Sequence, residues 1–266
     1  MKTVLTIAGS DSIGGAGIQA DIKAISANGC YAMSVITSVT AQNTMGVYGI
    51  HDIPPEFVKK QLEAVFSDIV PDAVKIGMLS NSQIIDSIAD FLKKNNVKNI
   101  VTDTVMVSTS GHRLITENAI TALSEKLIPI SDIITPNIPE AEVLSEMNIK
   151  TTDDMKMAAE KIMQFGCRSV IVKGGHLNNS AADVFFDGNS FTVLENPRID
   201  NPNTHGTGCT LSSSLAAFLA QGYSMKKGVE LAKGYVTGAI ADCLDLGKGR
   251  GPLNHFYKKA GKANEL

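Results

Sequence analysis

Near the end of the chain, a glycine-rich segment runs directly into a stretch with helical spacing: Asn203-Thr204-His205-Gly206-Thr207-Gly208-Cys209-Thr210. Glycines before a helix leave backbone N–H groups free at the positive end of the helix dipole. Gly206, Thr207, Gly208 and Cys209 are therefore expected to bind an anion, above all a phosphate that gains charge during transfer. Cys209 would start the helix, where a thiol pKa is commonly lowered, so a thiolate could take a proton from a substrate hydroxyl. The alternative is an ordinary helix start with Thr210 as its cap and Cys209 as a small buried residue.

A second glycine-rich segment follows the first apolar run: Gly14-Gly15-Ala16-Gly17-Ile18-Gln19-Ala20-Asp21. Three glycines in four residues allow the backbone to approach a ligand closely and to start a helix there. The segment matches neither GxGxxG nor the GxxxxGK[ST] phosphate loop. A tight strand-to-helix turn explains it equally well. Asp21 would lie in the first turn of the helix, where it either complements the dipole or binds a ligand hydroxyl or amine.

Three short segments that follow apolar runs carry residues suited to magnesium and phosphates. Asp103 ends one run, and Asn137 and Glu140 follow another in Thr135-Pro136-Asn137-Ile138-Pro139-Glu140. Such carboxylates hold Mg²⁺ or its waters, but a helix capped by Asn137 explains the second segment equally well. A third run is followed by Lys173-Gly174-Gly175-His176. Its lysine would meet a phosphate and its glycines a nucleotide, unless the lysine is simply solvated.

The order of apolar and helical patterns predicts the elements that would hold these segments. Buried strands are expected at residues 4–8, 31–39, 73–79, 100–105, 133–135 and 169–172. Helices are expected at residues 17–27, 84–92, 119–127, 153–165, 209–221 and 225–244, with another opening at Pro54 and Pro55. Asp187-Gly188 indicates a hairpin, and Ser224 is expected to open the last helix. Such alternation predicts an α/β fold: a mostly parallel sheet covered by helices on both faces, with ligands beyond the carboxyl ends of its strands.

Composition excludes several classes of function. The chain has 266 residues, 44% of them hydrophobic and 19% charged, which predicts a single domain over residues 1–266. With 24 basic and 27 acidic residues the net charge is −3, so we expect no general affinity for nucleic acid or an anionic membrane. The four cysteines form no CxxC pair, and no apolar run approaches the ~18 residues of a membrane span. A soluble, cytoplasmic protein is therefore expected.

Taken together, these segments resemble the hydroxymethylpyrimidine/phosphomethylpyrimidine kinase family, a branch of the ribokinase-like superfamily. Besides the segments above, the resemblance rests on Gly9-Ser10-Asp11, Thr40-Ala41-Gln42-Asn43-Thr44, Lys75-Ile76-Gly77-Met78-Leu79 and Asp103-Thr104-Val105-Met106. It runs from about residue 3 to Phe256, with every segment in the family's order. It implies a ribokinase-like α/β fold, ATP with Mg²⁺, and two successive phosphorylations of hydroxymethylpyrimidine in thiamine biosynthesis. Because the family is often dimeric, a homodimer is expected.

The resemblance also implies roles for individual residues. Those that would line the pyrimidine pocket are Asp21, Gln42, Met78 and Val105. The amide of Gln42 can pair with both donor and acceptor sites on an aminopyrimidine edge. The nucleotide and metal side would comprise Asn137, Glu140, Lys173, Gly174, Gly175, His176, Asp183 and Gly208, with Asp103 and Glu140 as metal ligands. The glycine motif of the wider superfamily ends in an aspartate base, whereas this branch has cysteine, here Cys209.

Two alternatives accompany this interpretation. The pyridoxal kinase branch shares nearly every motif, but its members have Met at the position of Gln42, and some carry a cysteine at the position of Ser108. A nucleotide- or vitamin-binding regulator without turnover would have lost the glycine motif or its cysteine. The chain departs from the family at Thr109, where many relatives have lysine, and at Ile13, which replaces a small residue. Ser108 to Arg113 is the candidate lid.

Overall fold

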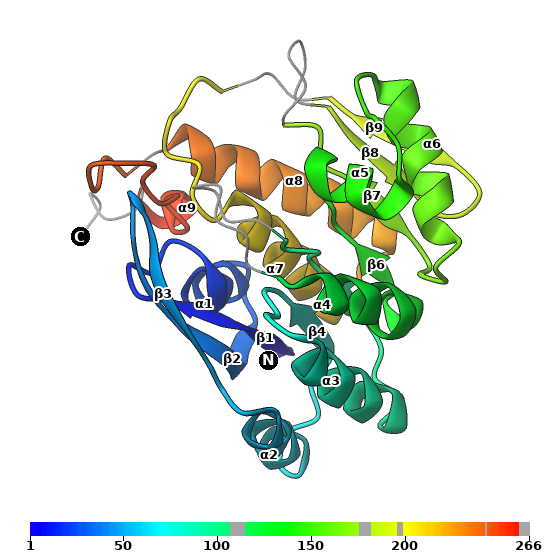
Figure 1. Ribbon diagram of the computed structural model, residues 1–266. Coiled ribbons are helices and arrows are strands. Elements are labelled where there is room, and N and C mark those ends of the chain that lie inside the picture. The colour runs from blue at the N-terminus through cyan, green and yellow to red at the C-terminus, as the bar shows by residue number, and fades with distance from the viewer. Residues whose placement is uncertain (107–114, 176–181, 196–198, 243, 261–266) are drawn as a thin grey trace.

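A single sheet of nine strands forms the centre of the computed structural model, which describes residues 1–106, 115–175, 182–195, 199–242 and 244–260 (Figure 1). The spatial order is β3-β2-β1-β4-β5-β6-β7-β8-β9. The six strands from β2 to β7 in that order pair in parallel, whereas β3 on one edge and β8 and β9 on the other pair antiparallel. The strands are β1 Thr3–Asp11, β2 Tyr31–Asn43, β3 Gly46–Asp52, β4 Ala73–Ile76, β5 Ile100–Thr102, β6 Ile133–Ile134, β7 Val170–Val172, β8 Asp183–Phe186 and β9 Phe191–Leu194.

Helices cover both faces of the sheet. They are α1 Gly17–Ala27, α2 Pro55–Phe66, α3 Ser82–Lys94, α4 Glu117–Ala122, α5 Ile138–Ser145, α6 Thr152–Met163, α7 Thr207–Ala220, α8 Met225–Ala241 and α9 Tyr257–Ala260. A π-helical turn, Leu123–Leu127, and a 3₁₀ turn, Ile128–Ile130, continue α4. None of the described helices combines the length and the apolar composition needed to span a membrane.

Two apolar cores lie on opposite faces because side chains alternate along each strand. Val4 of β1 packs with α1, α7 and α8, whereas its neighbour Leu5 packs in the core of α2 to α6. Ala73 and Val74 of β4 divide in the same way. The central strands are therefore apolar on both faces, as a covered parallel sheet requires.

The predicted α/β architecture is confirmed, and the main differences lie at the strand ends. β2 continues to Asn43 and pairs with β3, an antiparallel edge strand that the sequence analysis did not predict. The strands expected to reach residues 79 and 105 end at Ile76 and Thr102, so the residues after them are free to line a site. The short helix α5, capped by Asn137, agrees with the alternative given for residues 135–140, and α7 begins at Thr207 rather than at Cys209.

Local signals at two turns are confirmed. The carboxylate of Asp187 accepts the N–H groups of Asn189 and Ser190 in the β8–β9 hairpin, and Gly188 has a φ of 94°. That positive φ is open to glycine at little steric cost. The hydroxyl of Ser224 accepts the N–H of Lys227 and caps α8, as expected for a helix N-cap.

Candidate active site

A cavity of about 890 Å³ lies beyond the carboxyl ends of the parallel strands, against the N-terminus of α7. Most of the predicted site residues line it: Gln42, Met78, Asp103, Val105, Asn137, Glu140, Lys173, Gly175, Asp183, Gly206, Thr207, Gly208 and Cys209. This is the position expected for a ligand site in an open α/β sheet. Segments from distant parts of the chain therefore meet as the sequence analysis predicted.

The anion turn, residues Gly206 to Cys209, packs against the first glycine-rich turn. Gly206 has a φ of 82°, and a Cβ there would collide with the backbone oxygen of Gly15, so glycine is required for this close approach. No side chain caps α7, and the N–H groups of Gly208 and Cys209 lie in its first turn, where a helix offers no acceptor. They are thus available to an anion, whereas the N–H of Thr207 donates to Thr204.

The amides of the first glycine-rich turn bind a carboxylate of the chain itself rather than a ligand. Asp11, at the end of β1, accepts the N–H groups of Ile13, Gly15 and Ala16. Its Oδ2 also lies 2.9 Å from Nε2 of His205. Burial would raise the pKa of Asp11, but these hydrogen bonds outweigh burial and hold the pKa below its ordinary value. The amides of the turn are therefore occupied by the chain's own carboxylate, in agreement with the alternative of a strand-to-helix turn.

Asp103 and Lys173 form an ion pair beside the anion turn. Lys173 Nζ donates to Asp103 Oδ1 over 2.9 Å, and the hydroxyl of Thr135 donates to the same oxygen. A Cβ at Gly208 would lie 3.1 Å from Lys173 Nζ and 3.4 Å from Asp103 Oδ2, so the glycine lets both charges approach the helix end. Burial would raise the pKa of Asp103, but the ammonium groups of Lys173 and Lys75 outweigh it and lower the pKa. Asp103 is thus an anion, and Lys173 is a cation at the cavity wall.

Glu140 lies on the same wall as Asp103 and caps α5 together with Asn137. The Asn137 side chain accepts the N–H of Glu140, and Glu140 Oε2 accepts the N–H of Asn137. The predicted alternative of a capping box is therefore present, and both residues still line the cavity. Burial raises the pKa of Glu140 to about 7, against the opposing field of Lys173. A carboxyl with this pKa would ionise fully beside a bound cation.

The two carboxyls fit a magnesium site of the kind that nucleotide phosphates complete. No cluster of three or more His, Cys, Asp or Glu that could hold a metal occurs among the described residues. Mg²⁺ commonly binds through one or two carboxylates, several waters and substrate phosphates, so Asp103 and Glu140 match that donor set without a third protein ligand.

Asp183 and Lys233 form a further ion pair in the wall of the cavity. Asp183 Oδ1 accepts the N–H of Gly174, and Lys233 Nζ donates to Asp183 Oδ2 over 2.6 Å. A Cβ at Gly174 would collide with the backbone oxygen of Ala182, which explains this glycine sterically. Gly174 itself is not among the residues that line the cavity. Lys233 was not predicted, because a lysine in the middle of a helix carries no sequence signal.

Asp21 lies beneath the cavity, outside its lining. The side chain has 0% exposure, as does that of Lys75, whose Nζ lies 2.8 Å from Asp21 Oδ2. The hydroxyls of Thr6 and Ser213 also donate to the carboxylate, each over 2.6 Å. Burial would lower the pKa of Lys75, but the carboxylate of Asp21 raises it above its ordinary value. Lys75 is therefore a buried cation beside Asp21, and the pair is sealed in protein.

Cys209 lines the cavity, but its thiol differs from the prediction. Burial raises the pKa of Cys209 to about 11, although the nearby ammonium of Lys75 opposes this. The prediction of a lowered pKa at the helix start is therefore wrong. Lost solvation outweighs the dipole here, because desolvation disfavours the charged form of any buried thiol. At neutral pH Cys209 is a thiol.

Gln42, Met78 and Val105, which were predicted for a pyrimidine pocket, line the same cavity. Thr40 and His205 line the cavity beside Gln42, and both contact its amide. The sequence analysis assigned no role to Asp11, Thr40 or His205. Their positions at strand ends and before the anion turn were the available signal. His176 and the candidate lid, Ser108 to Arg113, lie outside the described residues.

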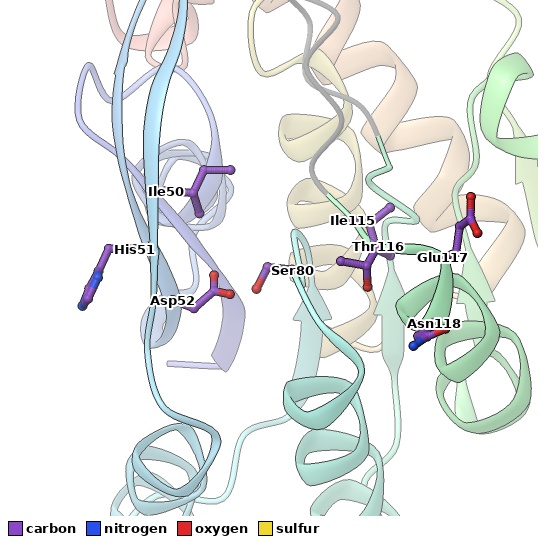
Figure 2. A pocket seen from close by; sticks show the side chains of 8 residues that line it. All are labelled: Ile50, His51, Asp52, Ser80, Ile115, Thr116, Glu117 and Asn118. Carbon is purple, nitrogen blue, oxygen red and sulfur yellow. The ribbon is translucent and has the colours of Figure 1, made fainter.

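A second cavity, of about 740 Å³, opens at the β3 edge of the sheet. Figure 2 shows Asp52 and Ser80 facing the start of α4, with His51 turned away on the other side of the strand. None of the predicted site residues lines it. The predicted site residues that line a cavity are therefore all in the larger one.

Comparison with known proteins identifies the family to which the chain belongs. The family profile described as phosphomethylpyrimidine kinase matches residues 11–254. A hydroxymethylpyrimidine/phosphomethylpyrimidine kinase of Haemophilus influenzae is 47% identical over 262 residues, covering 96% of this chain and 97% of that protein. A thiamine biosynthesis bifunctional protein of Geobacter sulfurreducens is 49% identical over 255 residues, or 96% of this chain. The chain spans 52% of that longer relative.

Two solved structures agree with the fold. Phosphomethylpyrimidine kinase from Clostridium difficile matches with a TM-score of 0.82 and 50% identity, covering 90% of this chain and 100% of that chain. An ADP complex of Bacillus subtilis pyridoxal kinase matches with a TM-score of 0.91 and 38% identity, covering 98% of this chain and 99% of that chain. The predicted ribokinase-like fold is confirmed.

Proposed function

Because the chain belongs to the phosphomethylpyrimidine kinase family, we propose that it phosphorylates 4-amino-5-hydroxymethyl-2-methylpyrimidine with ATP, and then phosphorylates the monophosphate so formed. One observation carries the proposal. A single cavity is lined by the N-terminus of α7, the Asp103–Lys173 pair and the amide of Gln42. A phosphoryl donor and a polar heterocycle would thus meet at the anion turn.

The anion turn would stabilise the transferring group. The N–H groups of Gly208 and Cys209 point from a helix N-terminus, where added negative charge is favoured. Lys173 would balance the charge of the γ-phosphate, and its bond to Asp103 fixes the position of its ammonium group. Phosphoryl transfer through a loose transition state depends mainly on such positioning and electrostatics.

Cys209 would position the acceptor rather than accept its proton first. With a pKa of about 11 the thiol stays protonated at neutral pH, so it is a poor general base. The acceptor hydroxyl would then lose its proton late, as the bond to phosphorus forms. The products of the first step are ADP, the pyrimidine monophosphate and one proton. In the second step an ionised phosphate oxygen of the monophosphate is the nucleophile, so the products are ADP and the diphosphate and no proton is released.

Asp103 and Glu140 would hold Mg²⁺, which would neutralise charge on the phosphates. On the nucleotide side, Asn137, Gly175 and Lys233 line the cavity and would lie near the phosphates, and Val236 and Ile240 of α8 would offer apolar surface for a base. Asp183 would act by holding Lys233 and the backbone at Gly174.

We further propose that residues 1–266 act as one domain, in the cytoplasm and as a homodimer. The family resemblance supports the dimer. The described cysteines, Cys30, Cys167 and Cys209, are free thiols, which supports a reducing compartment.

Product analysis tests the proposal. The purified chain is incubated with ATP, Mg²⁺ and the aminopyrimidine, with pyridoxal in a parallel reaction, and products are separated by mass. We expect the monophosphate first and the diphosphate later, and a weaker reaction with pyridoxal. Gln42→Met should weaken pyrimidine use relative to pyridoxal. Phosphorylation of pyridoxal alone would favour the pyridoxal kinase alternative, and binding without any product would favour a regulator.

A further inference from the structure

The amide of Gln42 lies between two polar side chains at the acceptor end of the cavity. One of its two terminal atoms lies 3.3 Å from Nε2 of His205, and the other lies 3.2 Å from Oγ1 of Thr40. The nitrogen and the oxygen of an amide have nearly the same shape, so the hydrogens of the partners decide which atom faces which. The donor or acceptor role of each partner can be assigned independently.

On the first side, His205 must act as a donor. Its Nε2 lies 2.9 Å from a carboxylate oxygen of Asp11. That carboxylate already accepts three backbone N–H groups of the glycine-rich turn, which stabilises its ionised form. An ionised carboxylate only accepts, so Nε2 of His205 carries its hydrogen. A protonated Nε2 has no lone pair, so an amide N–H facing it would be unpaired. The amide atom on this side is therefore Oε1, at 3.3 Å, which shares the hydrogen that His205 donates to Asp11 over 2.9 Å.

On the second side, Thr40 must act as an acceptor. Its hydroxyl lies 3.0 Å from the backbone oxygen of Ser10, which can only accept, so the single hydroxyl hydrogen is used there. The lone pairs of Oγ1 remain for the amide of Gln42. A donor is required on this side, so the amide atom facing Thr40 is Nε2.

The two sides agree, and together they fix the polarity of the amide. We infer that Thr40 and His205 are positioning residues that hold the Gln42 amide with Oε1 toward His205 and Nε2 toward Thr40. They thereby select an acceptor with an amino group beside its reacting arm. This inference rests on the proposed function, because it takes the aminopyrimidine as the acceptor.

The chemistry of the acceptor matches this polarity. On the pyrimidine ring, the 4-amino group lies between ring nitrogen N3 and the carbon that bears the hydroxymethyl arm. Oε1 of Gln42 would accept from the amino group, and the remaining hydrogen of Nε2 would donate to N3. His205 directly precedes Gly206, so the Oε1 end of the amide is the end nearer to the anion turn. The hydroxymethyl arm would therefore extend toward α7. The opposite amide polarity would turn the ring over and direct the arm away.

An analogue with reversed hydrogen-bond polarity tests the inference. In 5-hydroxymethyl-2-methylpyrimidin-4-one, N3 is a donor and the 4-oxygen an acceptor, while the reacting arm is unchanged. The measured quantity is the ratio of kcat/KM for the amino compound to kcat/KM for the oxo compound. For the wild type we expect about 100-fold or more, because a site built to pair with a polar edge rejects one that leaves its groups unpaired.

Two pairs of variants separate positioning from mere structure. Thr40→Val removes the acceptor at constant shape, and His205→Phe keeps a planar ring without its N–H. Each should lower the ratio by about tenfold or more, because the amide is then free to turn over. Thr40→Ser and His205→Gln keep the hydroxyl and the N–H, respectively, and should keep the ratio high. Thermal unfolding of each variant identifies those that fold. If the variants of one pair do not fold, the other pair still tests the inference.

The outcomes are distinct. The inference is supported if the ratio falls in every one of Thr40→Val and His205→Phe that folds, and stays high in the matching conservative variant. An unchanged ratio in the folded Thr40→Val or His205→Phe variant overturns it and leaves the proposed function standing. A wild type that does not turn over the amino compound overturns the proposed function, and the inference with it.

Discussion

Two carboxylate–ammonium pairs flank the first turns of α7, and they differ chiefly in access to solvent. Asp21 and Lys75 have side chains with 0% exposure, and the carboxylate accepts from Lys75, Thr6 and Ser213. In the Asp103–Lys173 pair, Lys173 retains 16% exposure and both residues line the cavity. The two pairs therefore carry the same charges but have different roles. The sealed pair holds β1, β4 and α7 together, and the open pair can exchange its partner for a ligand.

Breaking the sealed pair should give the largest effect, and on stability. Lys75→Met leaves the carboxylate of Asp21 buried without its counter-ion, which typically costs about 3–5 kcal/mol. Urea unfolding measures the loss. The double variant Asp21→Asn with Lys75→Met removes the orphan charge and should recover part of it. A single variant as stable as the wild type would contradict the description of this pair as sealed.

Breaking the open pair should act mainly on activity. Lys173→Met removes a cation expected at the γ-phosphate, and kcat/KM should fall by about 10²–10³-fold, as for the loss of one electrostatic contact in a transition state. Steady-state kinetics measures this. The loss in unfolding free energy should be smaller than in Lys75→Met, because water in the cavity can solvate Asp103. Equal stability losses in the two variants would remove the distinction.

The acid response should also come from the sealed side of α7. Burial lowers the pKa of His255 to about 4, from an ordinary value of 6.5, where the ring contacts Thr210. The unfolded chain then binds more protons than the folded chain between these two values, so stability falls as pH falls through that window. The wild type should lose about 2 kcal/mol between about pH 6.5 and pH 5 that His255→Gln does not lose.

Urea unfolding at several pH values measures that difference between the two proteins. Glu140, on the open side, contributes to stability with the opposite dependence on pH. Its pKa is raised to about 7, so the folded chain binds its proton more readily and this contribution is lost as pH rises. Subtracting the variant from the wild type removes the Glu140 contribution. If the free energies of unfolding of the wild type and of His255→Gln changed in parallel with pH, then His255 would not be held neutral in the folded chain.

The smallest effect is expected at Cys209, which lies between the two pairs. A thiol with a pKa of about 11 does not act as a base at neutral pH, so Cys209→Ser should lower kcat by less than about tenfold. The pH profile of kcat/KM should show no thiolate ionisation near neutrality. A loss of about 10³-fold with a profile that changes in the variant would restore Cys209 as a general base.

The same two pairs show how far sequence predicts a site. The alternation of apolar strands with helices predicted the sheet, and glycine spacing predicted the anion turn, because both depend on local pattern. Access to solvent does not depend on local pattern, so the sequence analysis did not predict it. Asp21 and Asp11 both follow a strand near the same glycines, yet one is sealed under α7 and the other fills the turn and contacts His205. Only the packing of segments distant in the chain decides between them.

Other omissions have similar causes. β3 combines two glycines with a mostly exposed surface, so it lacks the clear apolar alternation of a buried strand. The short helix α5 contains Pro139 near its start, and its Asn137 and Glu140 fit both a helix start and a metal site, so the local pattern did not decide between the two. Lys233 joins the site through α8, some 50 residues beyond its partner Asp183.

The central claim is direct transfer of a phosphoryl group from ATP to the acceptor at the N-terminus of α7. ATP made chiral at its γ-phosphorus with oxygen isotopes tests it most directly. The configuration at phosphorus is read from the pyrimidine monophosphate formed in the first step. One in-line displacement predicts inversion. Retention would require two displacements through a phosphorylated residue such as Cys209, and would contradict the direct mechanism.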